Sequence, residues 1–82
     1  MSQESVRSAR SQQQLLLLSD RLETSLRFAG ISPLQMADRL GTTESAVRSW
    51  LLGRSAPRLP HLMMWARHCG VPFDWLSGAD AP

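Results

Sequence analysis

The sequence predicts a small all-α protein built from four or five short helices. Apolar residues recur at spacings of three and four, as they do on one face of a helix. Glycines and prolines stand between the apolar stretches and predict tight turns. No stretch alternates like a convincing strand, and 82 residues are enough for one domain. The prediction is therefore a compact four- to five-helix bundle.

The domain boundaries follow from a change in composition. Residues 1–14 are almost all polar and predict a flexible N-terminal arm. Arg7 and Arg10 are candidate phosphate contacts in this arm, and a disordered tail without contacts is the alternative. Residues 15–78 form the predicted folded domain, and residues 79–82 a frayed tail.

The first predicted helix runs from about Gln14 to Ala29 and ends at Gly30. Its apolar stripe consists of Leu15, Leu18, Leu22 and Leu26. Leu16 and Leu17 fall outside that stripe. They are either excess apolar surface or a second contact surface for a partner.

Two short helices follow, predicted over residues 33–40 and about 44–52. Ser32 is a favourable N-cap followed by Pro33, and Thr43 is the N-cap of the next helix. Only three residues separate the two helices: Gly41, Thr42 and Thr43. Two short helices joined by a three-residue turn with a glycine form a helix-turn-helix. The second helix has a core face (Ala46, Val47, Trp50) and an outer face (Ser45, Arg48, Ser49, Leu52).

The last predicted elements are a helix from Pro60 to a stop at Gly70 and a turn over Pro72 to Leu76. The three tryptophans lie on apolar helix faces, so core or interface packing is favoured over base stacking. They are Trp50, Trp65 and Trp75.

Charge is unevenly distributed along the chain. The formal net charge is +2, but residues 39–68 hold five arginines against one acid, Glu44, which gives +4. A basic stretch of this kind suits a face that binds a polyanion. Ordinary solvated arginines are the alternative.

Several functional classes find no support in the sequence. Cys69 is the single cysteine and is predicted to be a small buried thiol. His61 and His68 have no further ligand at metal spacing, and no nucleophile–base pair suggests an enzyme. No cofactor, metal or small-molecule ligand is expected. The lack of a long apolar run or signal-peptide core predicts a cytoplasmic protein without membrane contact.

The segment ISPLQMADRLGTTESAVRSWLLGRSAP, followed by VPFDWLSG, resembles the Cro/C1-type (XRE) helix-turn-helix family of phage and bacterial repressors. The resemblance covers roughly residues 18–78. It is carried by Ala37, Gly41, Val47, Trp50, Gly53 and the closing Asp74-Trp75-Leu76. It implies a lambda-repressor-like DNA-binding domain.

The resemblance also implies site residues. The base-reading positions are Thr43, Glu44, Ser45, Arg48 and Ser49. Arginine can bond guanine bidentately, so Arg48 is the main candidate. Glu44 can accept from cytosine, orient Arg48, or favour the helix N-terminus. The phosphate-binding candidates are Gln35, Arg54 and Arg58.

Three departures from the family pattern involve four positions. Pro33 stands where many relatives carry a phosphate-anchoring glutamine, for which Gln35 and the backbone amides beginning that helix are candidate substitutes. Leu26 and Leu51 stand where relatives often have a buried arginine–glutamate pair. Leu52 occupies a site that is often polar.

The function expected from the resemblance is a repressor that binds a two-fold operator as a homodimer, with recognition helices ~34 Å apart. Relatives dimerise after the fourth helix, which implies Val71, Phe73, Trp75 and Leu76 as the interface. The small size suits a phage regulator. The alternative is a protein-interaction module, antitoxin-like or an accessory partner, which Leu16 and Leu17 would favour.

Overall fold

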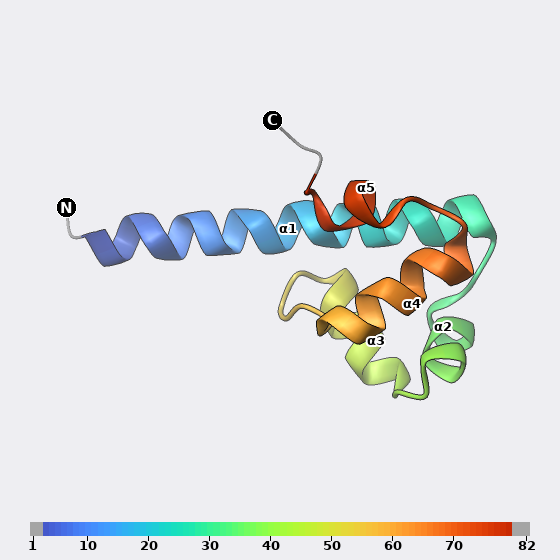
Figure 1. Ribbon diagram of the computed structural model, residues 1–82. Coiled ribbons are helices and arrows are strands. Elements are labelled where there is room, and N and C mark those ends of the chain that lie inside the picture. Colours follow the sequence, from blue (N-terminus) through green and yellow to red (C-terminus); the bar gives the residue numbers. More distant parts are fainter. Residues whose placement is uncertain (1–2, 80–82) are drawn as a thin grey trace.

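The computed structural model describes the backbone of residues 3–79 and the side chains of residues 12–79. Five helices and no strand are present in this part of the chain (Figure 1). They are α1 (Gln3–Ala29), α2 (Pro33–Leu40), α3 (Glu44–Leu51), α4 (Leu59–Cys69) and α5 (Phe73–Ser77). The predicted all-α fold is confirmed. Residues 80–82 of the predicted tail, and the side chains of Arg7 and Arg10, lie outside the described residues.

Helix α1 is longer than predicted, because it begins at Gln3 and not near Gln14. Residues 3–14, expected to form a flexible arm, continue the helix. The reason is local, since no glycine or proline interrupts residues 3–29 and several of the added residues are good helix formers. At 1.5 Å per residue, 27 residues span about 40 Å, so the N-terminal half of α1 extends beyond the other helices (Figure 1).

The remaining four helices pack beneath and beside the C-terminal half of α1. The side chains of Leu22, Met36, Val47, Trp65 and Leu76 are fully buried where the five helices meet. Trp50 and Trp65 belong to this core, as predicted, and Trp75 packs against it while remaining partly exposed. None of the helices in residues 3–79 combines the length and hydropathy needed to span a membrane.

Local signals fix the ends of α2 and α3, and so the angle at which they meet. The hydroxyl of Ser32 caps α2, which ends at Gly41 with φ of 70°. Thr43 caps α3 by accepting a hydrogen bond from the Ala46 N–H at 3.1 Å. Gly53 then turns the chain away in the left-handed conformation, φ 72°. The predicted helix-turn-helix is therefore present at the predicted residues.

Candidate nucleic-acid interface

Helix α3 turns its polar face away from the core. Val47 and Trp50 point inward and are 0% and 8% exposed. On the other side Ser45 and Arg48 are exposed, and Glu44 and Ser49 are half-buried. The side chain of Thr43 is already used as the cap of α3, so its hydroxyl oxygen has a backbone partner. Four of the five predicted base-reading side chains thus remain on an outward face of one helix.

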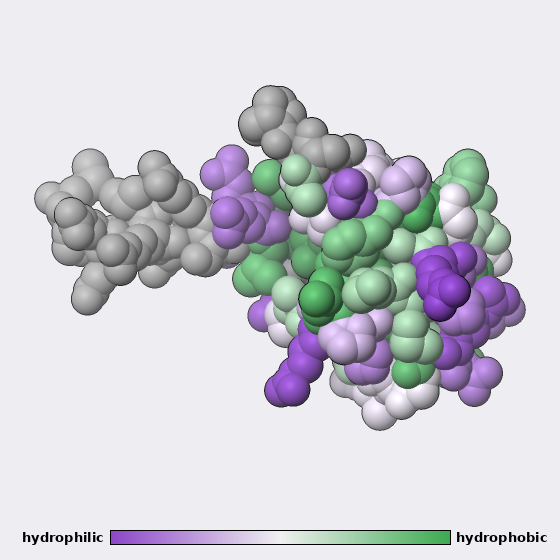
Figure 2. Space-filling model, in the orientation of Figure 1, coloured by the Kyte–Doolittle hydropathy of each residue, from purple (hydrophilic) through white to green (hydrophobic). Residues whose placement is uncertain are grey.

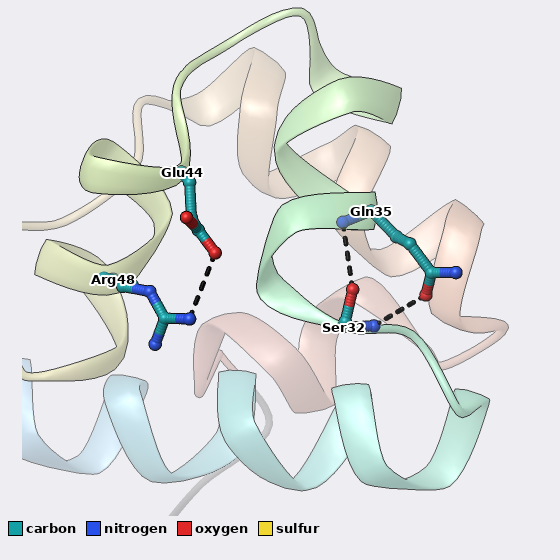
Figure 3. A network of polar contacts seen from close by, with 4 residues as sticks. All are labelled: Ser32, Gln35, Glu44 and Arg48. Carbon is teal, nitrogen blue, oxygen red and sulfur yellow. Dashed lines mark hydrogen bonds and ion pairs between the residues drawn. The ribbon is translucent and has the colours of Figure 1, made fainter.

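Glu44 and Arg48 form an ion pair one helical turn apart (Figure 3). Nη2 of Arg48 donates to Oε2 of Glu44 at 3.0 Å. The two side chains are 40% and 59% exposed, so the pair contributes little to stability. Of the roles considered for Glu44, orienting Arg48 is the one this geometry supports. The remaining guanidinium N–H groups of Arg48 can still reach an acceptor.

The start of α2 is closed by a capping box (Figure 3). The Gln35 N–H donates to Oγ of Ser32 at 3.1 Å, and the Ser32 N–H donates to Oε1 of Gln35 at 2.9 Å. Pro33 begins the helix between them and needs no hydrogen-bond acceptor. The amide oxygen of Gln35 is therefore used within the protein, whereas its NH₂ group points away from Ser32 and can donate to an anion.

A groove of about 610 Å³ lies where α1, α2 and α3 approach one another. Leu26 and Leu51, the two positions predicted to depart from the family's ion pair, both line it. Leu52, expected to be less suited to a backbone contact, is 60% exposed at its edge. Charged side chains also line this groove: Glu23, Arg27 and Arg48. Both arginines are paired with a glutamate one turn earlier in their helix.

The loop after α3 carries the two predicted phosphate-binding arginines, Arg54 and Arg58, and both are exposed. The loop is held to α3 by the Arg54 N–H, which donates to the Ser49 carbonyl at 3.0 Å. The hydroxyls of Ser49 and Ser55 are hydrogen-bonded at 2.8 Å. Sequence reasoning missed Ser55, because no spacing rule connects a helix residue with one in an irregular loop.

A family model described as helix-turn-helix matches residues 29–76 of the chain. That range is more than half of the chain. The chain belongs to the helix-turn-helix family. The match supports the Cro/C1 type and DNA binding by this chain. It begins at the last residue of α1, so nearly all of that helix lies outside it. No curated protein and no solved structure matches the chain.

For one residue of this helix-turn-helix protein, Leu76, the predicted place in a dimer interface is wrong. Leu76 is 0% exposed, because α5 turns it into the space between α1 and α4. It is a core residue and cannot contact a partner. Val71, Phe73 and Trp75 pack against the core and stay partly exposed, so they remain candidates.

The thiol of Cys69, in the core of this helix-turn-helix protein, is unsuited to catalysis. Cys69 is 3% exposed, and burial raises the pKa of its thiol. A raised pKa keeps the sulfur protonated and weakly nucleophilic at neutral pH. His61 packs its ring against Trp50, with centroids 5.7 Å apart. Within the described residues, no three or more His, Cys, Asp or Glu side chains are grouped to hold a metal ion.

Proposed function

We propose that the chain is a sequence-specific regulator of transcription, a repressor, which binds a two-fold operator in double-stranded DNA as a homodimer. Helix α3 enters the major groove, which is about 12 Å wide and admits a helix. The observation that carries the proposal is Arg48, exposed on the outer face of α3 and oriented by Glu44.

Each side chain of the interface then has a distinct role. Arg48 bonds a guanine through two N–H groups, and the exposed Ser45 offers its hydroxyl to a neighbouring base edge. Ser49 can contact a base edge with the hydroxyl that it shares with Ser55. Thr43 contributes less to base readout, because its hydroxyl oxygen already caps α3. Glu44 holds Arg48 in place through their ion pair.

Phosphate contacts fix the register of the protein on the duplex. The NH₂ group of Gln35 and the N-terminus of α2 take the place of the anchor that Pro33 removes. Arg54 and Arg58 hold a second stretch of backbone from their exposed loop. The two chains of the dimer place their α3 helices one DNA turn apart, ~34 Å. The protein works in the bacterial cytoplasm, at the nucleoid, or in the host cytoplasm if a phage encodes it.

The test has two stages. Selection of bound duplexes from a random DNA pool yields a two-fold consensus with half-sites one turn apart. Arg48→Ala then loses about 1–3 kcal/mol on the consensus and relaxes the preference at one base pair per half-site, because one bidentate contact disappears.

The control is Arg67→Ala, which removes an exposed arginine from the last turn of α4 and leaves the preference unchanged. If Arg48→Ala weakens binding equally on every sequence, Arg48 contacts phosphate and not a base. If no sequence is enriched, the proposal fails. The second candidate function, a protein-interaction module, would then be favoured by Leu16 and Leu17, which are 49% and 54% exposed.

A further inference from the structure

The hydroxyl of Ser55, in the loop between α3 and α4, contacts the outer face of α3 from outside that helix. Its Oγ lies 2.8 Å from Oγ of Ser49. Ser55 is exposed and Ser49 is half-buried. Within the described residues, the Ser55 side chain makes no other hydrogen bond. An exposed bond of this kind contributes little to folding, because water can replace either partner. Its consequence for binding lies in how it orients the two hydroxyls.

The backbone of the loop fixes Ser55 beside Ser49. Gly53 turns the chain with φ of 72°, and the Arg54 N–H then donates to the Ser49 carbonyl at 3.0 Å. Ser55 is the next residue. Consecutive residues of the loop therefore bond the carbonyl and the hydroxyl of Ser49. Figure 1 shows this loop, in yellow, between α3 and the start of α4.

The same loop is a positively charged part of the chain. Arg54 and Arg58 are exposed in it, and no aspartate or glutamate occurs from residue 45 to residue 73. Figure 2 shows strongly hydrophilic side chains projecting from the surface near this loop. Arginine and serine side chains are common donors to DNA phosphates. The Ser55 hydroxyl thus lies in a loop that suits the phosphate backbone.

The number of protons on the two hydroxyls limits what each can do. A serine hydroxyl has one proton and two acceptor lone pairs. A phosphate oxygen at neutral pH only accepts, so Ser55 must donate its one proton to it. The Ser55 oxygen then accepts the proton of Ser49, and Ser49 is left able only to accept. In the major groove an acceptor meets the exocyclic amines, N4–H₂ of cytosine and N6–H₂ of adenine.

We propose that Ser55 is a positioning residue that makes Ser49 a hydrogen-bond acceptor for a base amine. The amine donates to Ser49, Ser49 donates to Ser55, and Ser55 donates to a phosphate. Hydrogen bonds in such a chain polarise and strengthen one another. Without Ser55 the Ser49 hydroxyl rotates freely and can also donate to a base oxygen or nitrogen, so it discriminates less. This inference rests on the proposed DNA binding and assigns the chemistry of one of its base contacts.

The first experiment compares the sequences that wild-type protein and its variants select from a random duplex pool. Ser49→Ala identifies the base pair that Ser49 reads, because the preference relaxes there. We expect Ser55→Ala to relax the preference at that same base pair, although Ser55 touches no base. Ser55→Thr keeps a hydroxyl and is expected to restore the preference.

The matched control is Ser77→Ala, which removes a hydroxyl from α5, where it donates to the Asp74 carbonyl. It should leave every position of the selected sequence unchanged. Circular dichroism confirms that the variants keep their helices, as expected for the exposed Ser55. An unchanged preference in Ser55→Ala, or equal weakening on every sequence, would overturn the positioning role.

The second experiment tests the direction of the chain with modified bases at the identified base pair. Purine in place of adenine, or 2-pyrimidinone in place of cytosine, deletes the amine. Wild-type affinity is expected to fall about threefold to tenfold per half-site, the effect of one hydrogen bond. Ser49→Ala and Ser55→Ala should lose less than about twofold, because they have already lost this contact. The comparison with the variants corrects for the weaker base pair. An amine deletion that affects wild type no more than the variants would overturn the proposal.

These outcomes are distinguishable from failure of the proposed function. If wild-type protein selects a sequence and Arg48→Ala relaxes it, while Ser55→Ala does not, the proposed function stands and the role of Ser55 falls. If wild-type protein selects no sequence, both fall.

Discussion

Ser25 of α1 holds the indole of Trp65 from inside the core. Nε1 of Trp65 donates to its hydroxyl at 2.8 Å, and the hydroxyl donates in turn to the Leu22 carbonyl at 2.6 Å. Both side chains are 0% exposed, so no water can replace either bond. A buried indole N–H needs such a partner. This contact joins α1 to α4 across 40 residues of sequence.

Ser25→Ala tests this contact. The substitution leaves the Trp65 N–H buried without an acceptor, so the free energy of unfolding falls by about 1–3 kcal/mol. Ser19→Ala is the matched control. Ser19 is also buried in α1, but its hydroxyl donates only to the Leu16 carbonyl, and we expect a loss below about 1 kcal/mol. Urea denaturation of both variants measures the difference, and equal losses would contradict the assigned role.

At the residue scale, sequence predicted the features that follow from local periodicity and missed a contact between residues far apart in the chain. The burial of Trp65 and Cys69 and the outward face of Arg48 follow from helical periodicity, and sequence predicted them. The pairing of Ser25 with Trp65 depends on how α1 and α4 pack, which no spacing reveals. Leu76 was misassigned for the same reason, because a five-residue helix has no long stripe from which to infer its buried side.

At the scale of elements, helix ends set by local chemistry were predicted well. The cap at Ser32, the proline after it and the glycine at 41 fix α2 within a few residues of sequence. The start of α1 has no such signal. Its first turns are polar and uninterrupted, so composition alone suggested an arm, although the backbone continues as helix.

Gly53→Ala tests how α1 and the end of α3 fit together. A Cβ at Gly53 would lie 3.0 Å from Cδ2 of Leu16, and its φ of +72° disfavours any side chain. The control is Gly41→Ala, with φ of +70° and nothing within 4 Å of the added atom. Both variants lose about 1–2 kcal/mol of stability from the left-handed conformation.

Gly53→Ala should lose more, because Leu16 must also move. Urea denaturation measures the free energy of unfolding of both variants. Their difference reports the contact of Leu16 with the loop after α3. If Gly41→Ala loses as much as Gly53→Ala, Leu16 does not restrain this loop.

At the scale of the whole molecule, sequence predicted the all-α class and the helix-turn-helix, and the family match covers that same region. The packing of α5 along α1 was not predicted. It brings Leu17 and Phe28 beside residues about 50 positions later in the chain, and it depends on the packing of a helix only five residues long. Leu17 lay outside the predicted core stripe, and Phe28 was not singled out in the sequence.

The distribution of charge over the molecule predicts how DNA binding depends on salt. The formal net charge is only +2, so we expect the salt dependence to come from the proposed contacts of individual arginines with phosphates. Each phosphate contact releases counterions and steepens the plot of log Kd against log salt by about 0.9.

Arg54→Ala should therefore weaken binding similarly on every sequence and make the slope shallower by about 0.9 per chain. The control is again Arg67→Ala, which removes the same charge from the last turn of α4, outside the loop. It should change the slope less. Binding is measured by fluorescence anisotropy at about 50 to 200 mM salt, a range over which affinities for DNA change enough to give a slope. An unchanged slope would show that Arg54 touches no phosphate. The proposed register of α3 on DNA would then depend on Arg58 and on the N-terminus of α2, where the Gln35 NH₂ group is the candidate donor.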